Sequence, residues 1–162
     1  MILEGIKNKI MDLEEIVSWS RQKKQDGQKL VFTNGCFDLI HLGHLQYLSQ
    51  AKELGDLLII GVNSDSSVER LKGPGRPVKD EYSRASLLAA LTMVDAVTIF
   101  KEDTPLNLIK QIQPDMLCKG GDWHINQIVG AREVLDNGGE VKSLPFLQGH
   151  STTSLVQKAR QE

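Results

Sequence analysis

Short apolar runs alternate along this chain with segments in which apolar residues recur at helical spacing. A short apolar run closed by glycine is typical of a buried strand, whereas apolar residues three or four positions apart indicate an amphipathic helix. We expect strands at 29–35, 57–63, 95–100, 115–121 and 140–146. We expect helices at 12–26, 42–55, 66–71, 83–94, 105–113, 125–139 and 151–162, and a glycine- and proline-rich loop at 72–80.

The order of these elements predicts the fold class. The expected strands are apolar on both faces and are separated by helices, which is the pattern of a parallel sheet covered on both sides. We therefore predict an α/β fold with a doubly wound, five-stranded parallel sheet (Rossmann-like) at residues 29–162, preceded by a helical extension at 1–28. Ligands of such sheets bind beyond the carboxyl ends of the strands. Residues that directly follow strands are therefore the candidate site.

Composition narrows the class of protein. The 162 residues are 40% hydrophobic and 25% charged, as in a globular domain, and a net charge of −2 argues against a nucleic-acid partner. No apolar run approaches the ~18 residues of a membrane span, which predicts no membrane insertion. The N-terminal segment carries scattered charges instead of the apolar core of a signal peptide. Two widely spaced cysteines, Cys36 and Cys118, predict free thiols in a cytoplasmic protein.

Two histidines follow the first expected strand, where a helix begins. The strand leads into Asn34, Gly35, Cys36, Phe37 and Asp38, and then into HLGH at 41–44. Gly35 allows a sharp turn, and a helix N-terminus that contains His44 favours an anion such as phosphate. Gly43 between the histidines has no side chain to obstruct a bulky ligand. The pattern favours a phosphate site.

Three other roles for His41 and His44 stay open. They could be packing residues, although a pair that flanks glycine after a tight turn makes this reading weaker. They could bind zinc, but their spacing differs from HExxH and no third ligand stands nearby, so we predict no protein-held metal. Cys36 with His41 could form a thiol–imidazole pair, but no nucleophile elbow such as GxSxG is present.

Residues after the other strands complete the candidate site. They are Asn63 and Asp65, then Lys119, Gly120 and Asp122, and finally Gly149, Ser151, Thr152 and Thr153. One hydroxyl suffices to cap the last helix, so three in succession favour a polyphosphate at its N-terminus. Lys72 and Arg76 belong to the 72–80 loop, which is either simply solvated or able to close over an anion.

HLGH at 41–44 and STT at 151–153, in this order, resemble the motifs of the HxGH nucleotidyltransferase superfamily over about residues 29–160. Within it, the segments RLKGPGRPV, KGGDW and IVGAREVLDNGGEV are similar to adenylyltransferases that make ADP-heptose. That activity is often fused behind a sugar kinase. No kinase segment precedes it in this sequence, so we expect the stand-alone form and a separate kinase. FLQGHST stands where the glycerol-3-phosphate cytidylyltransferase branch has RTEGIST, which argues against that branch.

The resemblance, together with the positions of residues after the strands, suggests a role for each candidate residue. His41, His44 and Lys72 would be catalytic, through contacts with phosphates. Nucleotide binding would fall to Asn34, Gly35, Cys36, Phe37, Asp38, Gly43, Lys119, Gly120, Asp122, Gly149, Ser151, Thr152 and Thr153. The second substrate would be bound by Asp38, Asn63, Asp65, Lys72 and Arg76.

We therefore expect transfer of AMP from ATP to D-glycero-β-D-manno-heptose 1-phosphate, a sugar 1-phosphate, with release of pyrophosphate. Since a sugar phosphate is already an anionic nucleophile, catalysis requires positioning and positive charge, not a base. Mg²⁺ is expected to arrive with ATP. One alternative is a cytidylyltransferase with another small phosphate acceptor; another is a non-catalytic nucleotide-binding module, although GxGxxG is missing. The N-terminal helix makes a homodimer the expected assembly.

Overall fold

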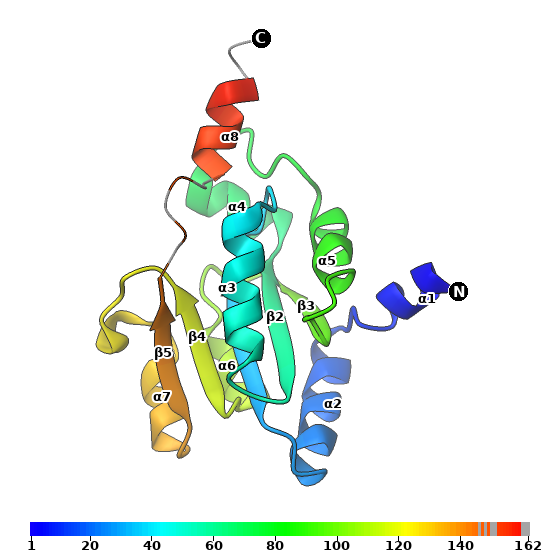
Figure 1. The fold of residues 1–162 in the computed structure, drawn as a ribbon, viewed down its shortest axis with the longest axis vertical. Coiled ribbons are helices and arrows are strands. Elements are labelled where there is room, and N and C mark those ends of the chain that lie inside the picture. The colour runs from blue at the N-terminus through cyan, green and yellow to red at the C-terminus, as the bar shows by residue number, and fades with distance from the viewer. Residues whose placement is uncertain (146, 148, 150–151, 160–162) are drawn as a thin grey trace.

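A computed structural model of the protein describes residues 1–145, 147, 149 and 152–159 (Figure 1). Its centre is a five-stranded sheet in the order β3-β2-β1-β4-β5, in which every pair of neighbours is parallel. The strands are β1 (Leu30–Gly35), β2 (Leu57–Asn63), β3 (Ala96–Phe100), β4 (Met116–Gly120) and β5 (Glu140–Leu144). The predicted doubly wound α/β fold is confirmed.

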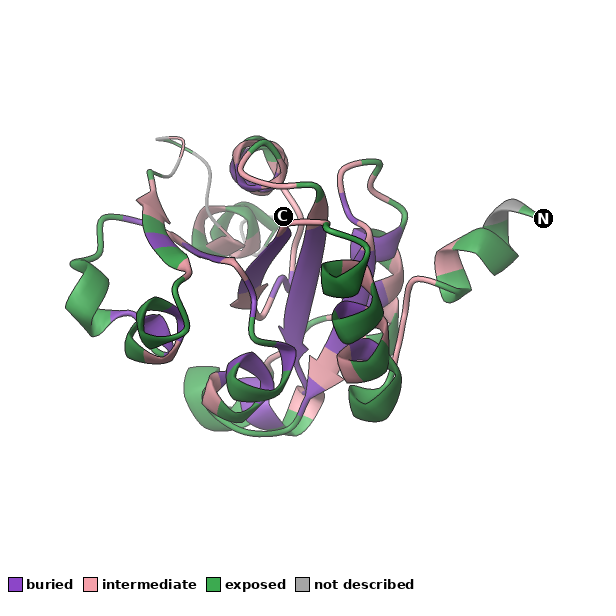
Figure 2. Cartoon of the chain, turned by 90° about the horizontal axis from the view of Figure 1, so that it is seen from below, coloured by how far each residue is buried: buried purple, intermediate pink, exposed green. Residues whose placement is uncertain are grey.

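Helices cover both faces of the sheet (Figure 2). One face carries α3 (Leu42–Lys52) and α5 (Glu81–Ala89), and the other carries α2 (Leu13–Gln25), α6 (Leu106–Ile112) and α7 (Ala131–Asp136). The short α1 (Ile2–Lys7) lies beside α5, while α4 (Asp65–Lys72) and α8 (Thr152–Ala159) lie at the carboxyl ends of the strands (Figure 1). No helix among the described residues is both long and apolar enough to cross a membrane.

Side chains of β1 alternate between two hydrophobic clusters. Val31 packs with residues of α3 and α5, whereas Leu30 and Phe32 pack with residues of α2, α6 and α7, and all three are fully buried. Because successive residues of a strand point to opposite faces, a strand buried on both sides must be apolar at every position. This explains why the central strands appear in the sequence as continuous apolar runs.

The helix α2 begins at a capping box. The Asp12 carboxylate accepts a hydrogen bond from the Glu15 backbone N–H, and the Glu15 carboxylate accepts one from the Asp12 N–H, both at 2.9 Å. Ile16 is fully buried in the same cluster as Leu30 and Phe32. Residues 1–28 thus share a core with the sheet, and the proposed division at residue 28 stays a prediction.

Two predicted helices differ most from the structure, and the helix expected at 42–55 ends three residues earlier, at Lys52. The prediction of one continuous helix at 125–139 is wrong. The segment instead forms a 3₁₀ turn, η1 (Ile125–Gln127), followed by α7. Gly130 lies between them, and its φ of +85° does not fit an α-helix. The helix expected at 83–94 ends earlier, at Ala89. In both places apolar residues continue past the end of the helix, so periodicity alone does not mark the boundary.

The sheet opens where the strand order reverses. The β1 strand pairs with β2 over six residues, but its register with β4 comprises only Val31 with Met116 and Phe32 with Leu117. From this pair of strands the chain builds outward in opposite directions, towards β3 on one side and β5 on the other. Such a switch point leaves a crevice at the carboxyl ends. In the described sheet it lies between Gly35 and Gly120, beyond the short ladder.

The contact between α7 and α6 predicts a difference between two glycines with similar backbone conformations. A Cβ at Gly130 (φ +85°) would lie 2.5 Å from Cδ1 of Ile109, whereas one at Gly138 (φ +81°) would meet no atom within 4 Å. We expect Gly138→Ala to lower the free energy of unfolding by about 1–2 kcal/mol, the cost of a left-handed residue. Gly130→Ala should cost about 1–3 kcal/mol more, through overpacking.

Urea unfolding of the two variants measures both losses. Equal losses in the two variants would contradict the described packing of Gly130 against α6.

Candidate active site

A cavity of about 700 Å³ occupies the crevice at the carboxyl ends of the strands. It brings together residues that are far apart in the sequence and that the strand-end rule predicted. Those predicted residues are Asn34, Gly35, Cys36, Phe37, Asp38, His44, Asn63, Lys72, Arg76, Lys119, Gly120, Thr152 and Thr153. Most of the predicted site therefore lines one cavity.

Other predicted residues lie outside this lining. His41, Gly43, Asp65, Asp122 and Gly149 do not line the cavity, and Ser151 lies outside the described residues. The His41 ring lies against the His44 ring, with centroids 3.9 Å apart. Asp65 accepts a hydrogen bond at 2.8 Å from the buried Arg84. His41 and Asp65 therefore contact residues that build the site, His44 and Arg84, without lining the cavity themselves.

His44 contributes an imidazole whose tautomer is fixed by the helix start. The His41 backbone N–H donates to Nδ1 of His44 at 3.3 Å, so a neutral His44 ring carries its proton on Nε2. Burial, together with the charge of His41, lowers the pKa of His44 to about 4. Without a bound anion, His44 is therefore a neutral N–H donor at pH 7.

The last described helix meets the HxGH turn. Thr152 at the N-terminus of α8 donates from Oγ1 to the Leu39 backbone oxygen, at 3.5 Å. Thr152 and Thr153 line the same cavity as His44. The two motifs thus lie at one end of the sheet (Figure 1), and a helix N-terminus that carries threonine hydroxyls favours an anion there.

Two lysines contribute positive charge from opposite sides of the crevice. Lys72 ends α4 and Lys119 belongs to β4, and both line the cavity. Within the part of the chain that the structure describes, neither ammonium forms an ion pair with a carboxylate. Burial and the positive charge of Lys72 lower the pKa of Lys119. A bound polyanion would relieve this repulsion.

Asp38 is engaged by the loop that follows α4. Its buried carboxylate accepts hydrogen bonds from Nε of Arg76 at 2.7 Å and from the backbone N–H groups of Val78 and Lys79 at 2.9 and 3.2 Å. Burial alone would raise its pKa, but these hydrogen bonds hold the pKa of Asp38 below its usual value. Asp38 is therefore an ionised anchor of the loop.

Arg84 secures the same loop from the other side. It is fully buried and donates to the backbone oxygens of Cys36 at 2.6 Å and Lys79 at 3.0 Å, and to Asp65 at 2.8 Å. A buried guanidinium is stable only with such partners. No sequence pattern singles out this helical arginine, because its partners come from three other segments.

Several lining residues were missed by the sequence analysis: Tyr47, Leu71, Asp103, Thr104, Pro105, Trp123, Gln127, Ile128 and Val129. Asp103, Thr104 and Pro105 follow β3, so the rule applied to the other strand ends would have found them. Trp123 is 46% exposed, and its indole N–H donates to the Gly120 oxygen at 3.0 Å, which fixes the ring at the edge of the cavity.

The alternatives to phosphate binding can be compared with this geometry. Among the described residues, no three histidine, cysteine, aspartate or glutamate side chains gather as a metal site. Burial raises the pKa of the Cys36 thiol, which disfavours the thiolate that a thiol–imidazole pair needs. The cavity therefore resembles an anion-binding site more than the active site of an enzyme with a thiol nucleophile.

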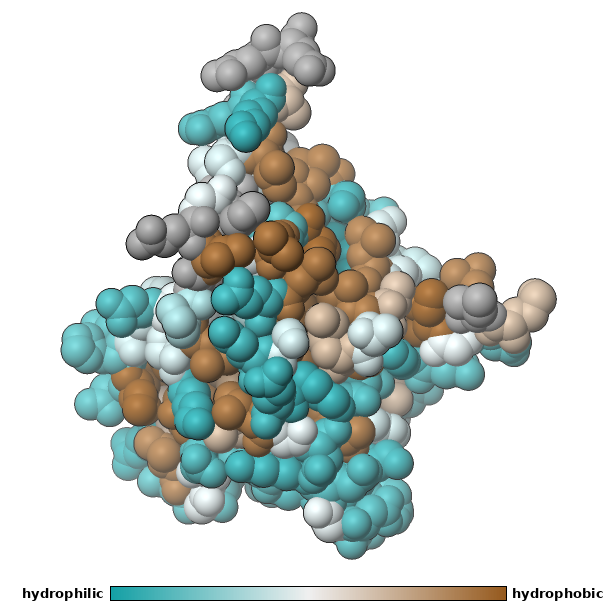
Figure 3. Space-filling model, viewed as in Figure 1, coloured by the Kyte–Doolittle hydropathy of each residue, from teal (hydrophilic) through white to brown (hydrophobic). Residues whose placement is uncertain are grey.

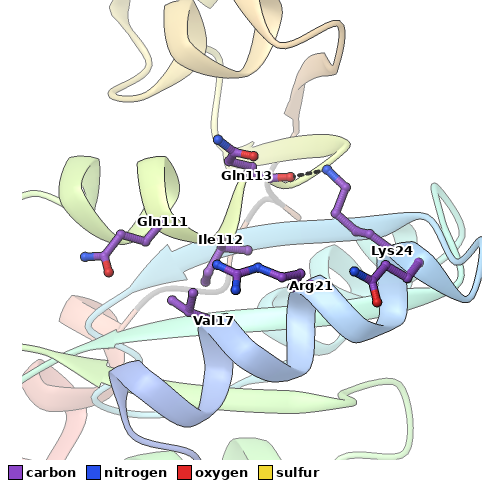
Figure 4. A pocket seen from close by; sticks show the side chains of 7 residues that line it. Val17, Arg21, Lys24, Gln111, Ile112 and Gln113 are labelled. Carbon is purple, nitrogen blue, oxygen red and sulfur yellow. Dashed lines mark hydrogen bonds between the residues drawn. The ribbon is translucent and has the colours of Figure 1, made fainter.

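A second hollow of about 410 Å³ lies at the opposite end of the sheet, between α2 and α6 (Figure 4). Its lining includes Arg21, Gln111 and Gln113, and Lys24 donates from Nζ to the Gln113 backbone oxygen at 2.7 Å. None of the predicted site residues lines it.

The fold, the HxGH turn and the cavity define a nucleotidyltransferase. The sequence pattern of the cytidylyltransferase-like family matches residues 32–158, from β1 to α8, and the chain belongs to this family.

Particular relatives agree with this assignment. The bifunctional protein HldE of a Nitratiruptor species is 52% identical over 151 residues, which cover 93% of this chain and 32% of that protein. HldE of Geotalea uraniireducens (strain Rf4) is 50% identical over 94% of this chain and 31% of its own length. The chain thus spans about a third of the curated relatives that it matches.

Solved structures share the fold. The lipopolysaccharide core biosynthesis protein of Thermoplasma volcanium GSS1 superposes with a TM-score of 0.61 at 29% identity, covering 76% of this chain and all of that one. The pantoate-beta-alanine ligase of Francisella tularensis, at 15% identity and a TM-score of 0.55, shares the fold alone.

The environment of His44 predicts a specific titration. Its ring resonances, followed by NMR, should titrate with a midpoint near 4 in the ligand-free protein, because burial disfavours the imidazolium. Addition of ATP should raise this midpoint, since a bound polyphosphate stabilises the charged ring. A midpoint at or above 6.5 in the free protein would contradict the described burial.

The same pKa shift predicts how stability depends on pH. Between pH 6.5 and 4 the unfolded chain binds a proton at His44 more readily than the folded chain does, so acidification through this window destabilises the fold. His44→Asn should remove that part of the pH dependence, measured by urea unfolding at several pH values. An identical pH dependence in both proteins would oppose this account.

Proposed function

We propose that this protein transfers AMP from ATP to D-glycero-β-D-manno-heptose 1-phosphate and releases pyrophosphate. The observation that carries the proposal is the convergence of His44, Lys72, Lys119 and Thr152 on one cavity at the switch point of the sheet. The choice of a heptose phosphate is supported by the segments RLKGPGRPV and KGGDW, which resemble ADP-heptose-forming adenylyltransferases. Identity of about half with HldE proteins agrees with that choice.

The reaction needs no proton transfer to begin. An anionic oxygen of the sugar phosphate attacks the α-phosphorus of ATP, and a new phosphorus–oxygen bond forms. The bond between the α-phosphorus and the oxygen bridging to the β-phosphorus breaks, and its electron pair leaves with pyrophosphate. The barrier comes from the approach of two anions and from charge that grows on the phosphoryl oxygens, so positioning and donors control the rate.

The side chains around the cavity match these requirements. His44 would donate from Nε2 to a phosphate oxygen, and the α8 N-terminus with Thr152 and Thr153 would hold the triphosphate. Lys72 and Lys119 would neutralise charge from either side. The His41 ring lies tilted against that of His44 and would act on the phosphates only if it turned into the cavity.

Mg²⁺ would enter with ATP as part of the substrate. The carboxylates in the cavity lining are Asp38 and Asp103, which are paired with Arg76 and Arg70 at 2.7 Å. The chain thus offers the ion no free carboxylate there among the described residues. When bound to the phosphates, Mg²⁺ would supply charge neutralisation.

We also propose a homodimer in the cytoplasm. Apolar residues gather on the surface over α3, α5 and the base of α8 (Figure 3). Exposed large side chains of these elements and the loop before α5 are Leu42, Val78, Tyr82, Leu87 and Leu155. A second copy of the chain is the simplest partner for such a surface, and sedimentation velocity tests it. Sedimentation as a monomer would reject the dimer.

The proposed reaction is tested by measuring pyrophosphate release with each nucleoside triphosphate, Mg²⁺ and candidate acceptors. ATP with the heptose 1-phosphate should be the best pair. Faster release with CTP and a polyol or amino-alcohol phosphate would favour the cytidylyltransferase alternative. Calorimetric binding of nucleotide without any turnover would favour a non-catalytic binding module.

Replacement of His44 tests its role in the transition state. His44→Ala should lower kcat by about 10²–10³-fold, the scale for loss of one donor to a developing oxyanion, with little change in KM. His124→Ala serves as the matched control, because His124 is exposed and does not line the cavity. A raised KM at constant kcat would mean that His44 contributes only to ground-state binding.

A further inference from the structure

We propose that Arg76 binds the phosphate of the acceptor, and that Asp38 positions Arg76 without touching substrate. The inference rests on the proposed function for the identity of the acceptor. The proposal gives different roles to Asp38 and Arg76, which the sequence analysis both expected to bind the second substrate.

The geometry of the ion pair leaves part of Arg76 available. Asp38 contacts Arg76 through Nε alone, at 2.7 Å. Among the described residues, none accepts a hydrogen bond from the two terminal nitrogens of Arg76. Its side chain is 24% exposed and lines the cavity, whereas that of Asp38 is 2% exposed. The carboxylate is therefore behind the guanidinium, and the two terminal nitrogens, which no described residue engages, are accessible to a ligand.

A comparison with two other arginines distinguishes Arg76. Arg84 is fully buried, and its Nε and both terminal nitrogens have protein acceptors, so its role is structural. Arg70 also pairs with a carboxylate through Nε at 2.7 Å, but its NH2 group donates to the Lys101 oxygen and it does not line the cavity. Arg76 alone of these three combines a fixed Nε with a position in the cavity.

The chemistry of a guanidinium selects the ligand. Two terminal N–H groups in a fork match two oxygens of a phosphate, and a buried carboxylate behind the guanidinium restricts its rotamers before the ligand arrives. Lys72, four residues earlier, lines the same cavity and adds a point charge. Arg76 and Lys72 come from the segment after β2, and α8 contributes Thr152 and Thr153 to the same lining. We assign the first group to the acceptor and the second to ATP.

Asp38 acts through the loop that carries Arg76. Its oxygens also accept from the backbone N–H groups of Val78 and Lys79, so the carboxylate fixes residues 76–79 together. If this is its function, removal of its charge should matter only while Arg76 is present. A double-mutant cycle measures this dependence, because residues that act through one another are not additive.

The experiment compares Arg76→Ala, Arg76→Lys, Asp38→Asn and the double variant with the wild-type chain. Calorimetry gives the affinity for D-glycero-β-D-manno-heptose 1-phosphate and, separately, for ATP with Mg²⁺, and steady-state kinetics gives both KM values. Arg132→Ala is the matched control, since Nε of Arg132 also faces a carboxylate, that of Asp136 at 3.6 Å, and neither residue lines the cavity. Thermal unfolding reports whether each variant is folded.

Arg76→Ala should weaken acceptor binding by about 10- to 100-fold, the range for hydrogen bonds to a charged group, and change ATP binding less than about threefold. Arg76→Lys should bind the acceptor with intermediate affinity, because it retains the charge without the fork. Asp38→Asn should weaken acceptor binding about tenfold, and the double variant should bind no worse than Arg76→Ala. Arg132→Ala should behave as the wild type.

Equal loss of ATP and acceptor affinity in Arg76→Ala would overturn the inference, as would unchanged acceptor affinity. Additive losses in the double variant would refute the positioning role of Asp38. If Asp38→Asn does not fold, the Arg76 variants alone decide. Intact turnover of the heptose phosphate with unaffected binding in Arg76→Ala would reject this inference and leave the proposed function standing. A wild-type chain that binds no heptose phosphate would reject both.

Discussion

The short ladder between β1 and β4 is the constraint on which the rest of the structure depends. These two strands pair through Val31 and Phe32 with Met116 and Leu117, and the chain then builds outward from them in opposite directions. In the described sheet, no further strand lies between β1 and β4 beyond this ladder. The cavity forms there, and each loop that follows a strand adds to its wall. Fold and site therefore have one physical origin.

The loop after α4, which lines part of the cavity, is held by ionic and backbone contacts more than by apolar packing. Asp38 and Arg84 fasten residues 76–79 to the turn after β1, and both are buried. A buried charge that loses its partner is strongly destabilising, so this arrangement fixes one loop conformation. The same contacts distinguish cations that serve the structure from cations that can bind a ligand. Arg84 is saturated by protein acceptors, whereas Lys72 and Lys119 retain charge that a polyanion can use.

The sequence was most informative where local rules decide. The strand expected at 57–63 matches β2 because a buried parallel strand is apolar throughout, and the strand-end rule gathered most of the cavity lining. It was least informative where long-range contacts decide. Gly130 interrupts the helix expected at 125–139 beside Ile109 of another helix. The ion pair of Asp38 could not be predicted either, because its partner, Arg76, lies 38 positions away in the sequence.

The central claim is that the HxGH turn and the N-terminus of α8 bind the same triphosphate. The most direct measurement is a crystal structure with Mg²⁺ and a non-hydrolysable ATP analogue. The account predicts Nε2 of His44 and a hydroxyl of Thr152 or Thr153 within about 2.7–3.2 Å of phosphate oxygens of one nucleotide. Phosphates that contact only one of the two segments, or that lie outside the cavity, would contradict it.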